Sequence, residues 1–306
     1  MEQTGRPVFK GLRRLRYADA AEEIKDAWAS PYRWWWSYLR LSKDYWWVCQ
    51  QKGETLDSDL RAMWQDFGDV FSSSFNDWWR KQGRMLFAEQ MRLPHVRKIN
   101  DQASNLNPNA DGHLLIEIPL NLTERTISRQ VLALLRAETK RKVKPASKSA
   151  RQLCKLRGIR MEVLETAHNV WCLTQLIDQA KQPRSKLGKP FNAMTSQQLG
   201  IALRLVRSCM PKPTDSEDVE RRRRNGMKVA VSRMLTRANA LIANAEIGNF
   251  PSVEPVAHRK RWTAKQQKAL DAAIEAGKWR SPAVNETSLR ELLRWPKLPA
   301  KPKLPG

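Results

Sequence analysis

The spacing of apolar and polar residues predicts helices along almost the whole chain. It is clearest at residues 214–248, where apolar residues return every three or four positions, as on one face of a helix. The apolar positions are Met227, Val231, Met234, Leu235, Ala238, Leu241, Ile242 and Ala245. Thr214 and Glu217 have the spacing of a capping box, and Gly248 followed by Pro251 is a typical stop signal. We therefore predict one helix over 214–248, roughly 50 Å long.

Shorter helices are predicted on either side of this segment, where amphipathic stretches follow capping residues or proline. They are 17–29, 31–41, 43–51, 56–67, 75–90 with a break at Gly83, a segment from Thr123, 160–181, a segment from Thr195 to Pro211, and 263–277. The one predicted strand is 113–120, an apolar run that ends at Pro119. The fold class is therefore mainly α and multi-helix, with at most a minor β element.

Tryptophan is concentrated near the N-terminus, since nine of the 13 tryptophans lie between Trp28 and Trp79. Aromatic side chains of this size bury a large area and would form the core of a small helical module. The alternative is a platform on which nucleic-acid bases stack, but the near-neutral charge of the segment favours the core. Trp34, Trp35 and Trp36 are consecutive and cannot share one buried face, so we predict that they contribute to a surface for a protein partner.

Charge is distributed very unevenly. The formal net charge is +24, and residues 1–94 contribute 15 Lys/Arg against 13 Asp/Glu, a net of +2. Residues 95–306 hold 40 against 18, a net of +22. Such a charge destabilises a compact state by self-repulsion, and a bound polyanion would offset it. The balance therefore predicts a nucleic-acid partner for the second part of the chain, with DNA favoured over RNA.

Two clusters of basic residues are the candidate phosphate contacts. Residues 140–160 contain nine Lys/Arg and no acid, and 221–224 are four consecutive arginines within the long predicted helix. The candidates are Lys140, Arg141, Lys142, Lys144, Lys148, Arg151, Lys155, Arg157, Arg160, Arg221, Arg222, Arg223, Arg224, Lys228, Arg233 and Arg237. The alternatives are a solvated linker at 140–160 and a solvated turn at 221–224, which Glu217, Asp218 and Glu220 would balance.

These observations predict a division into modules. We expect a tryptophan-rich helical module at 1–94, a polar linker at 95–112, a basic helical module at 113–250, a small helical unit at 251–295 and a basic, proline-rich tail at 296–306.

The sequence offers little for catalysis or metal binding. The four histidines are isolated and the four cysteines have no paired spacing, which is typical of reduced cysteines in a cytoplasmic protein. All four tyrosines lie in the aromatic segment, which argues against a tyrosine recombinase. Asp111 and Glu117 faintly resemble a nuclease motif, but Pro119 stands where a lysine is expected. No apolar run reaches the length of a membrane span. We expect no enzyme activity, no cofactor, no metal and no membrane association.

Two stretches carry weak resemblances. Residues 75–79, with Gly83, Leu86 and Phe87, resemble a segment of uncharacterised proteins from proteobacterial mobile elements or phages, over about residues 30–90. Trp262, Trp279 and Trp295 are spaced somewhat as in a Myb repeat, a three-helix DNA-binding unit. Residues 264–267 lack the acidic cluster of that repeat. Neither resemblance implies a catalytic residue.

The function that follows is non-catalytic nucleic-acid binding, with double-stranded DNA favoured, through Lys and Arg contacts to phosphates. Two alternatives remain open at this point. One is a structural or adaptor protein that binds a protein partner through residues 1–94. The other is a nuclease or RNA-processing enzyme without a recognisable motif. A helix-turn-helix around 195–207 would need a second helix after a short turn, and none is predicted there.

Overall fold

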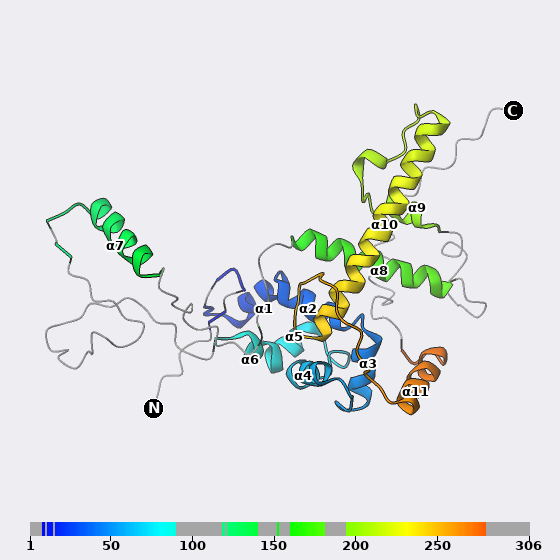
Figure 1. Ribbon diagram of the computed structural model, residues 1–306, viewed down its shortest axis with the longest axis horizontal. Coiled ribbons are helices and arrows are strands. Elements are labelled where there is room, and N and C mark those ends of the chain that lie inside the picture. Colours follow the sequence, from blue (N-terminus) through cyan, green and yellow to red (C-terminus); the bar gives the residue numbers. More distant parts are fainter. Residues whose placement is uncertain are drawn as a thin grey trace. The chain divides into compact units, whose positions relative to one another are not determined.

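The computed structural model describes residues 8–9, 11–14, 16–89, 118–119, 121–139, 152, 160–180 and 194–279. These residues form helices joined by loops, and no strand is present among them (Figure 1). The prediction of a mainly α fold is confirmed. Within the same residues, no helix combines the length and the apolarity that crossing a bilayer requires.

Contacts divide the chain into two compact units, one made of Met1–Ala88 with Gln152–Gly306 and the other of Glu89–Arg151. The first unit joins the tryptophan-rich segment to the basic helices that follow residue 152. The predicted separation of a module at 1–94 from a module at 113–250 is therefore wrong for the described residues, because one hydrophobic core contains side chains of both. The predicted linker at 95–112 and tail at 296–306 lie outside the described residues.

The N-terminal part of the first unit is a series of short helices. They are α1 (Ala20–Trp28), α2 (Pro31–Leu39), α3 (Lys43–Gln50), α4 (Ser58–Phe67), α5 (Phe75–Trp78), a π-helical turn (Trp79–Gly83) and α6 (Arg84–Phe87). A side chain accepts a backbone N–H at the start of each of α1 to α5, which explains where these helices begin. The predicted break at Gly83 is the π-helical turn, where a β-carbon would come within 2.6 Å of the Trp78 ring.

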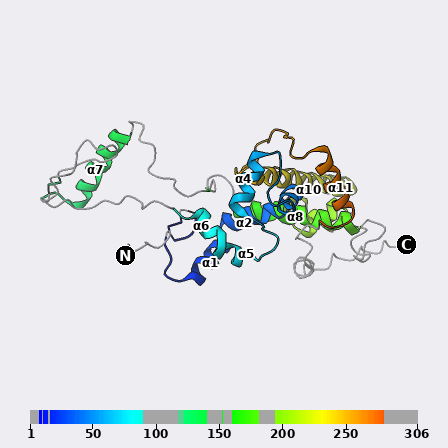
Figure 2. The same cartoon turned by 90° about the horizontal axis from the view of Figure 1, so that it is seen from below.

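The rest of the first unit is built around one long helix. Its elements are α8 (Met161–Ala180), α9 (Ser196–Ala202), a 3₁₀ turn (Arg207–Cys209), α10 (Glu217–Glu246) and α11 (Ala264–Glu275). Figures 1 and 2 show α10 lying across α8. The predicted long helix is confirmed. Its predicted capping box is wrong, because Ser216 is the N-cap residue and makes no side-chain capping bond. Asp215, which precedes it, accepts from the Lys212 N–H and pairs with Arg223.

Helix α9 is shorter than the sequence predicts. Its capping box, Thr195 with Gln198, is confirmed. It ends at Ala202 instead of continuing to Pro211, because Arg204 adopts a left-handed backbone conformation with φ of 49°. The Leu205 N–H then donates to the Gly200 carbonyl at 3.0 Å, which closes the end of the helix. The described residues therefore contain no second helix at a short distance after α9, and a helix-turn-helix is absent there.

The core is centred on α2, and this overturns the prediction of a partner surface at Trp34, Trp35 and Trp36. All three side chains are buried. Helix α2 contacts α1, α8 and α10, so it has no free face. Each tryptophan meets a different neighbour: Trp34 packs on His168 of α8 at 5.4 Å, Trp35 on Phe67 of α4 at 5.2 Å and Trp36 on Phe75 of α5 at 5.6 Å, between ring centroids. A consecutive triplet can be buried when the helix that carries it is enclosed.

The segment after α10 also packs on this core, so the prediction of a small separate unit at 251–295 is wrong for its described residues. Trp262 is buried, and its indole N–H donates to Asp44 of α3 at 3.0 Å. Arg261 pairs with Asp44 and with Glu246, both at 2.6 Å. Trp295, the last tryptophan of the Myb-like spacing, lies outside the described residues.

His168 gives the fold a dependence on pH. Its ring lies edge-on to Trp34 and Tyr38, and burial lowers the pKa of His168 to about 4. Because the pKa in the unfolded chain is about 6.5, the unfolded state binds a proton first as the pH falls. The stabilisation is therefore complete above pH 6.5 and is lost as the pH falls toward 4. Part of the His168 residue is accessible to water, which weakens the effect of burial, so we expect a loss of about 2–3 kcal/mol.

Urea denaturation between pH 7 and pH 4 measures this loss. A His168→Gln variant, neutral throughout this range, should have a flatter stability profile than the natural chain. Parallel profiles for the two proteins would assign the acid sensitivity to other groups.

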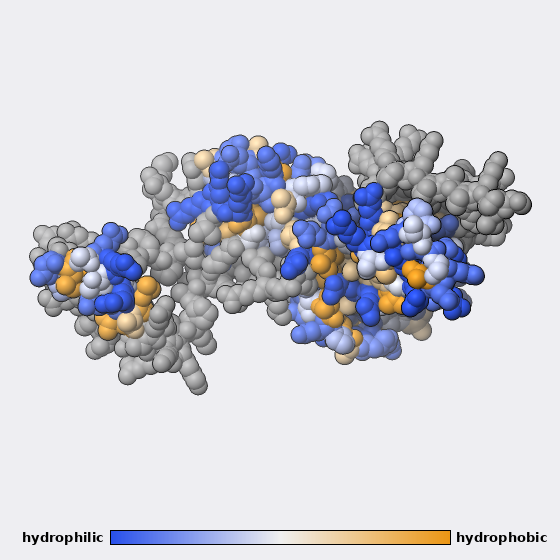
Figure 3. All heavy atoms as spheres, turned by 90° about the horizontal axis from the view of Figure 1, so that it is seen from above, coloured by the Kyte–Doolittle hydropathy of each residue, from blue (hydrophilic) through white to orange (hydrophobic). Residues whose placement is uncertain are grey.

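The second unit contains helix α7 (Glu124–Thr139), which the sequence predicted from Thr123. Leu132, Leu134 and Leu135 of this helix are exposed, and Figure 3 shows apolar side chains gathered on it among hydrophilic ones. Of the predicted strand 113–120, only Ile118 and Pro119 are described, and they have no regular secondary structure.

Candidate nucleic-acid interface

Helix α10 has one buried side and one side open to solvent. Met227, Val231, Ala238, Leu241 and Ala245 face the core. From Arg221 to Ala245 the helix contains seven Lys/Arg and no Asp or Glu. The open side therefore exposes cations with no carboxylate of the same segment to neutralise them.

The four consecutive arginines have different roles. Arg221 pairs with Asp218 at 3.1 Å, and Arg224 pairs with Glu220; both pairs are exposed and lie within the helix. Arg223 turns inward, where it pairs with Asp215 at 3.1 Å and donates to the Met210 carbonyl at 2.6 Å. Exposed pairs of this kind contribute little to stability, so Arg221 and Arg224 can exchange partners at small cost.

Arg223 is thus a correction to the candidate contacts, since it ties α10 to the preceding loop. Its side chain is only 19% exposed, and that of Asp215 is 7% exposed. Four consecutive arginines point around a full turn of the helix and cannot all meet acids on one neighbouring face. Three of them do find acids, because these come from the helix itself and from the preceding loop. Arg222 is exposed and has no ion-pair partner among the described residues.

The second half of the helix adds further exposed cations. Lys228, Arg233 and Arg237 are exposed and form no ion pair within the described part of the chain. Arg222, Arg233 and Arg237 are separated by 11 and 4 residues, which at 3.6 residues per turn places them on one side of the helix. The rise of 1.5 Å per residue separates the first from the last by about 22 Å. This row is called the α10 face below. Lys228 points about 120° away from Arg222 around the helix and lies outside the row.

Polar side chains lie between these cations. Asn225, Ser232 and Thr236 are exposed on the same open side, together with Val229. Amide and hydroxyl groups of this kind can bind phosphate or base edges. The face thus combines cations with neutral hydrogen-bonding groups.

The elements next to the first half of α10 are also basic. Arg204, Arg207 and Lys212 are exposed in the segment from α9 to α10, which packs on α10. Residues 194–245 hold ten Lys/Arg against four Asp/Glu, a net of +6. Helix α8, by contrast, has three Asp/Glu and no Lys or Arg. The positive charge of this part of the unit therefore comes from the α9–α10 segment.

Helix α10 is held along its length. At its first third, the 3₁₀ turn packs so closely that a β-carbon at Gly226 would lie 2.6 Å from the Cys209 sulfur. Glycine weakens a helix interior, but the missing side chain of Gly226 allows this contact. At the other end, the Ala245 carbonyl accepts from the Trp35 indole at 3.2 Å. The cations of the α10 face are therefore carried on a fixed element.

The second predicted cluster of phosphate contacts is residues 140–160. Of residues 140–160, only Gln152 and Arg160 are described, and Lys140, Arg141, Lys142, Lys144, Lys148, Arg151, Lys155 and Arg157 lie outside the described residues. Arg160 is exposed immediately before α8. The prediction of phosphate contacts at 140–160 stays a prediction.

No group of three or more His, Cys, Asp or Glu side chains in the described part of the chain is arranged to hold a metal ion. Comparisons with protein-family models, with characterised proteins and with solved structures give no match. The geometry and charge of the α10 face are therefore the features that indicate a function.

Proposed function

We propose that the chain binds nucleic acid, with double-stranded DNA favoured, and that the α10 face supplies phosphate contacts. The observation that supports this proposal is the acid-free segment 221–245 of α10, which carries Arg222, Arg233 and Arg237 on one side, exposed and without an ion pair among the described residues. Neutralising phosphates releases condensed counterions, which makes such a surface an effective polyanion site. The net charge of +24 adds long-range attraction.

A duplex suits this surface better than a flexible strand. The row from Arg222 to Arg237 is straight and about 22 Å long because it lies on one helix, and it matches an extended, regular array of phosphates. Phosphate contacts position a protein without reading sequence, so the proposal concerns the class of ligand and not a particular site. The resemblance of residues 30–90 to proteins of mobile elements or phages is consistent with DNA as that ligand.

The test is a triple variant, Arg222→Gln, Arg233→Gln and Arg237→Gln, titrated with duplex DNA at several salt concentrations. Each lost phosphate contact should make the slope of log affinity against log salt shallower by about 0.9, or about 2.7 for three. The weakening should be similar for unrelated duplex sequences. Glutamine is nearly as good a helix former as arginine, so circular dichroism should show unchanged helix content.

Arg13→Gln is the control, because Arg13 is exposed and lies in the N-terminal segment before α1, not on α10. It removes one positive charge, where the triple variant removes three, and should leave the slope unchanged. If the triple variant folds and keeps the full slope, the α10 face is not the binding surface. Cleavage of the duplex in added Mg²⁺ or Mn²⁺ would instead favour the nuclease alternative.

A further inference from the structure

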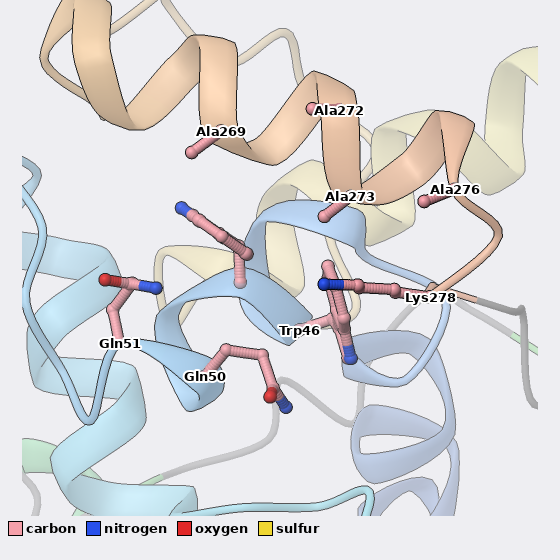
Figure 4. A pocket seen from close by; sticks show the side chains of 9 residues that line it. Trp46, Gln50, Gln51, Ala269, Ala272, Ala273, Ala276 and Lys278 are labelled. Atoms are coloured by element: carbon pink, nitrogen blue, oxygen red, sulfur yellow. The ribbon is translucent and has the colours of Figure 1, made fainter.

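A cavity of about 720 Å³ lies between α3 and α11, in the part of the unit that the α10 face does not use. One wall is α3 with its C-cap residue Gln51, and it carries Trp46, Trp47 and Gln50. The other wall is α11 with its C-cap residue Ala276, and it carries Ala269, Ala272 and Ala273; Lys278 lies two residues further on. Figure 4 shows the Lys278 side chain extending from the end of α11 into the space between the helices.

The shape and chemistry of this cavity select a flat ligand. Four alanines form a shallow wall on α11, and the wall across from them carries two indole rings whose centroids are 5.7 Å apart. Such an arrangement leaves a slot between an aromatic surface and a low apolar one. The amides of Gln50 and Gln51 each offer both a donor and an acceptor, as the edge of a nucleobase requires.

The one charged residue among those that line the cavity is Lys278. None of its lining residues is acidic. Lys265 precedes Ala269 by one turn on the same side of α11, and Lys43 precedes Trp46 and Trp47 in the same way on α3; both lysines are exposed. Together with Lys278 they place three lysines near the aromatic slot, and a combination of aromatic and cationic side chains is typical of surfaces that bind single-stranded nucleic acid.

We propose that this cavity binds a nucleobase, with the base against Trp46 and Trp47 and its phosphate at Lys278. The inference rests on the proposed nucleic-acid function and extends it from the duplex to unpaired bases. The ligand is a nucleotide, which can come from a single strand or from free nucleotide in solution.

The experiment compares an oligothymidylate with an abasic strand of equal length, by fluorescence anisotropy on the full chain. Stacking on an aromatic side chain should make the natural chain bind the thymidylate at least roughly tenfold more tightly. Ala272→Phe should remove this preference, because Ala272 is exposed on the wall of the cavity and a phenyl group would fill it. Lys278→Gln should weaken binding of both strands.

Two controls separate the cavity from general effects. Ala264→Phe makes the same substitution at an exposed position of α11 outside the cavity and should keep the preference. Lys268→Gln removes the same charge as Lys278→Gln at an exposed position of α11 that does not line the cavity, and should have a smaller effect on both strands. Displacement of the labelled thymidylate by thymidine monophosphate would show that a free nucleotide suffices; resistance to it would assign the site to bases within a strand.

The outcomes distinguish this inference from the proposed function. Equal affinity for the thymidylate and the abasic strand, or a preference that survives in Ala272→Phe, would overturn the base-binding site while leaving duplex binding by α10 intact. If Ala272→Phe removes the preference and the α10 triple variant leaves duplex binding unchanged, the base-binding cavity is supported and the α10 face is rejected as the duplex-binding surface.

Discussion

Replacing Arg261 by methionine should destabilise the first unit by about 3 kcal/mol at pH 7, because it leaves buried carboxylates without their cation. The guanidinium lies 2.6 Å from Asp44 and from Glu246, and 3.7 Å from Asp57. The side chains of Glu246 and Asp57 are 5% and 1% exposed. The backbone contacts at this residue should survive, since its carbonyl accepts from Leu56 and Thr55 in either protein.

The loss should depend on pH in a defined direction. Burial raises the pKa of Glu246, and attraction to Arg261 and the hydrogen bond from Ser42 oppose this rise. Without Arg261 the pKa of Glu246 should rise further above its value in the unfolded chain. A carboxyl group whose pKa is higher in the folded than in the unfolded state stabilises the folded protein at low pH, and this stabilisation is lost as the pH rises. The difference in unfolding free energy between variant and natural chain should therefore shrink from pH 8 to pH 5.

Arg259→Met is the matched control. Arg259 pairs with Asp59 near the same place, and both side chains are 42% exposed, so water screens that pair. Arg259 also lies 3.7 Å from the buried Asp57, but its own side chain is 42% exposed. Its replacement should cost far less than that of Arg261 and show little dependence on pH. Equal losses for the two variants would mean that the carboxylates around Arg261 are solvated in solution. The measurement is the unfolding free energy from urea titrations.

Local elements of the fold were predictable because their causes are local. Capping residues such as Ser42 and Thr195, and the apolar spacing after Met227, lie next to the helices that they define. The division into modules was not predictable, because it depends on contacts between residues far apart in the sequence. Trp35 and Ala245 are 210 residues apart, and no periodic pattern in either segment indicates that they meet.

The same distinction applies to the candidate site. Composition identified the basic helix, since 221–245 lacks acids in the sequence itself. Composition did not show that Arg223 is tied to the preceding loop while Arg222 faces solvent. That difference depends on the path of the loop that brings Asp215 and the Met210 carbonyl to Arg223. The cavity between α3 and α11 was missed for a similar reason, because its two walls are more than 200 residues apart. The only local signal of the cavity in the sequence was a lysine one helical turn before each wall, Lys43 before Trp46 and Lys265 before Ala269.

Replacing Trp35 by alanine should cost about 3–5 kcal/mol, because it removes the largest kind of side chain from the centre of the core. Trp35 is fully buried, and its ring lies 5.2 Å from that of Phe67 and 5.7 Å from that of Phe250. Trp28→Ala is the matched control, since Trp28 is 46% exposed and the same truncation there should cost much less. Thermal unfolding followed by near-ultraviolet circular dichroism measures both.

The Trp35 variant also tests whether the aromatic segment and α10 form one cooperative unit. The indole of Trp35 belongs to α2 but donates to the Ala245 carbonyl near the end of α10. Trp35→Phe keeps an aromatic ring and removes that donor, so it should cost less than Trp35→Ala, about 1–2 kcal/mol. With one core, either substitution should lower the stability of α2 and of α10 by the same amount in hydrogen-exchange measurements, because both open in the same transition. Weakened protection in α2 with unchanged protection in α10 would mean that two independently stable modules only touch at this contact.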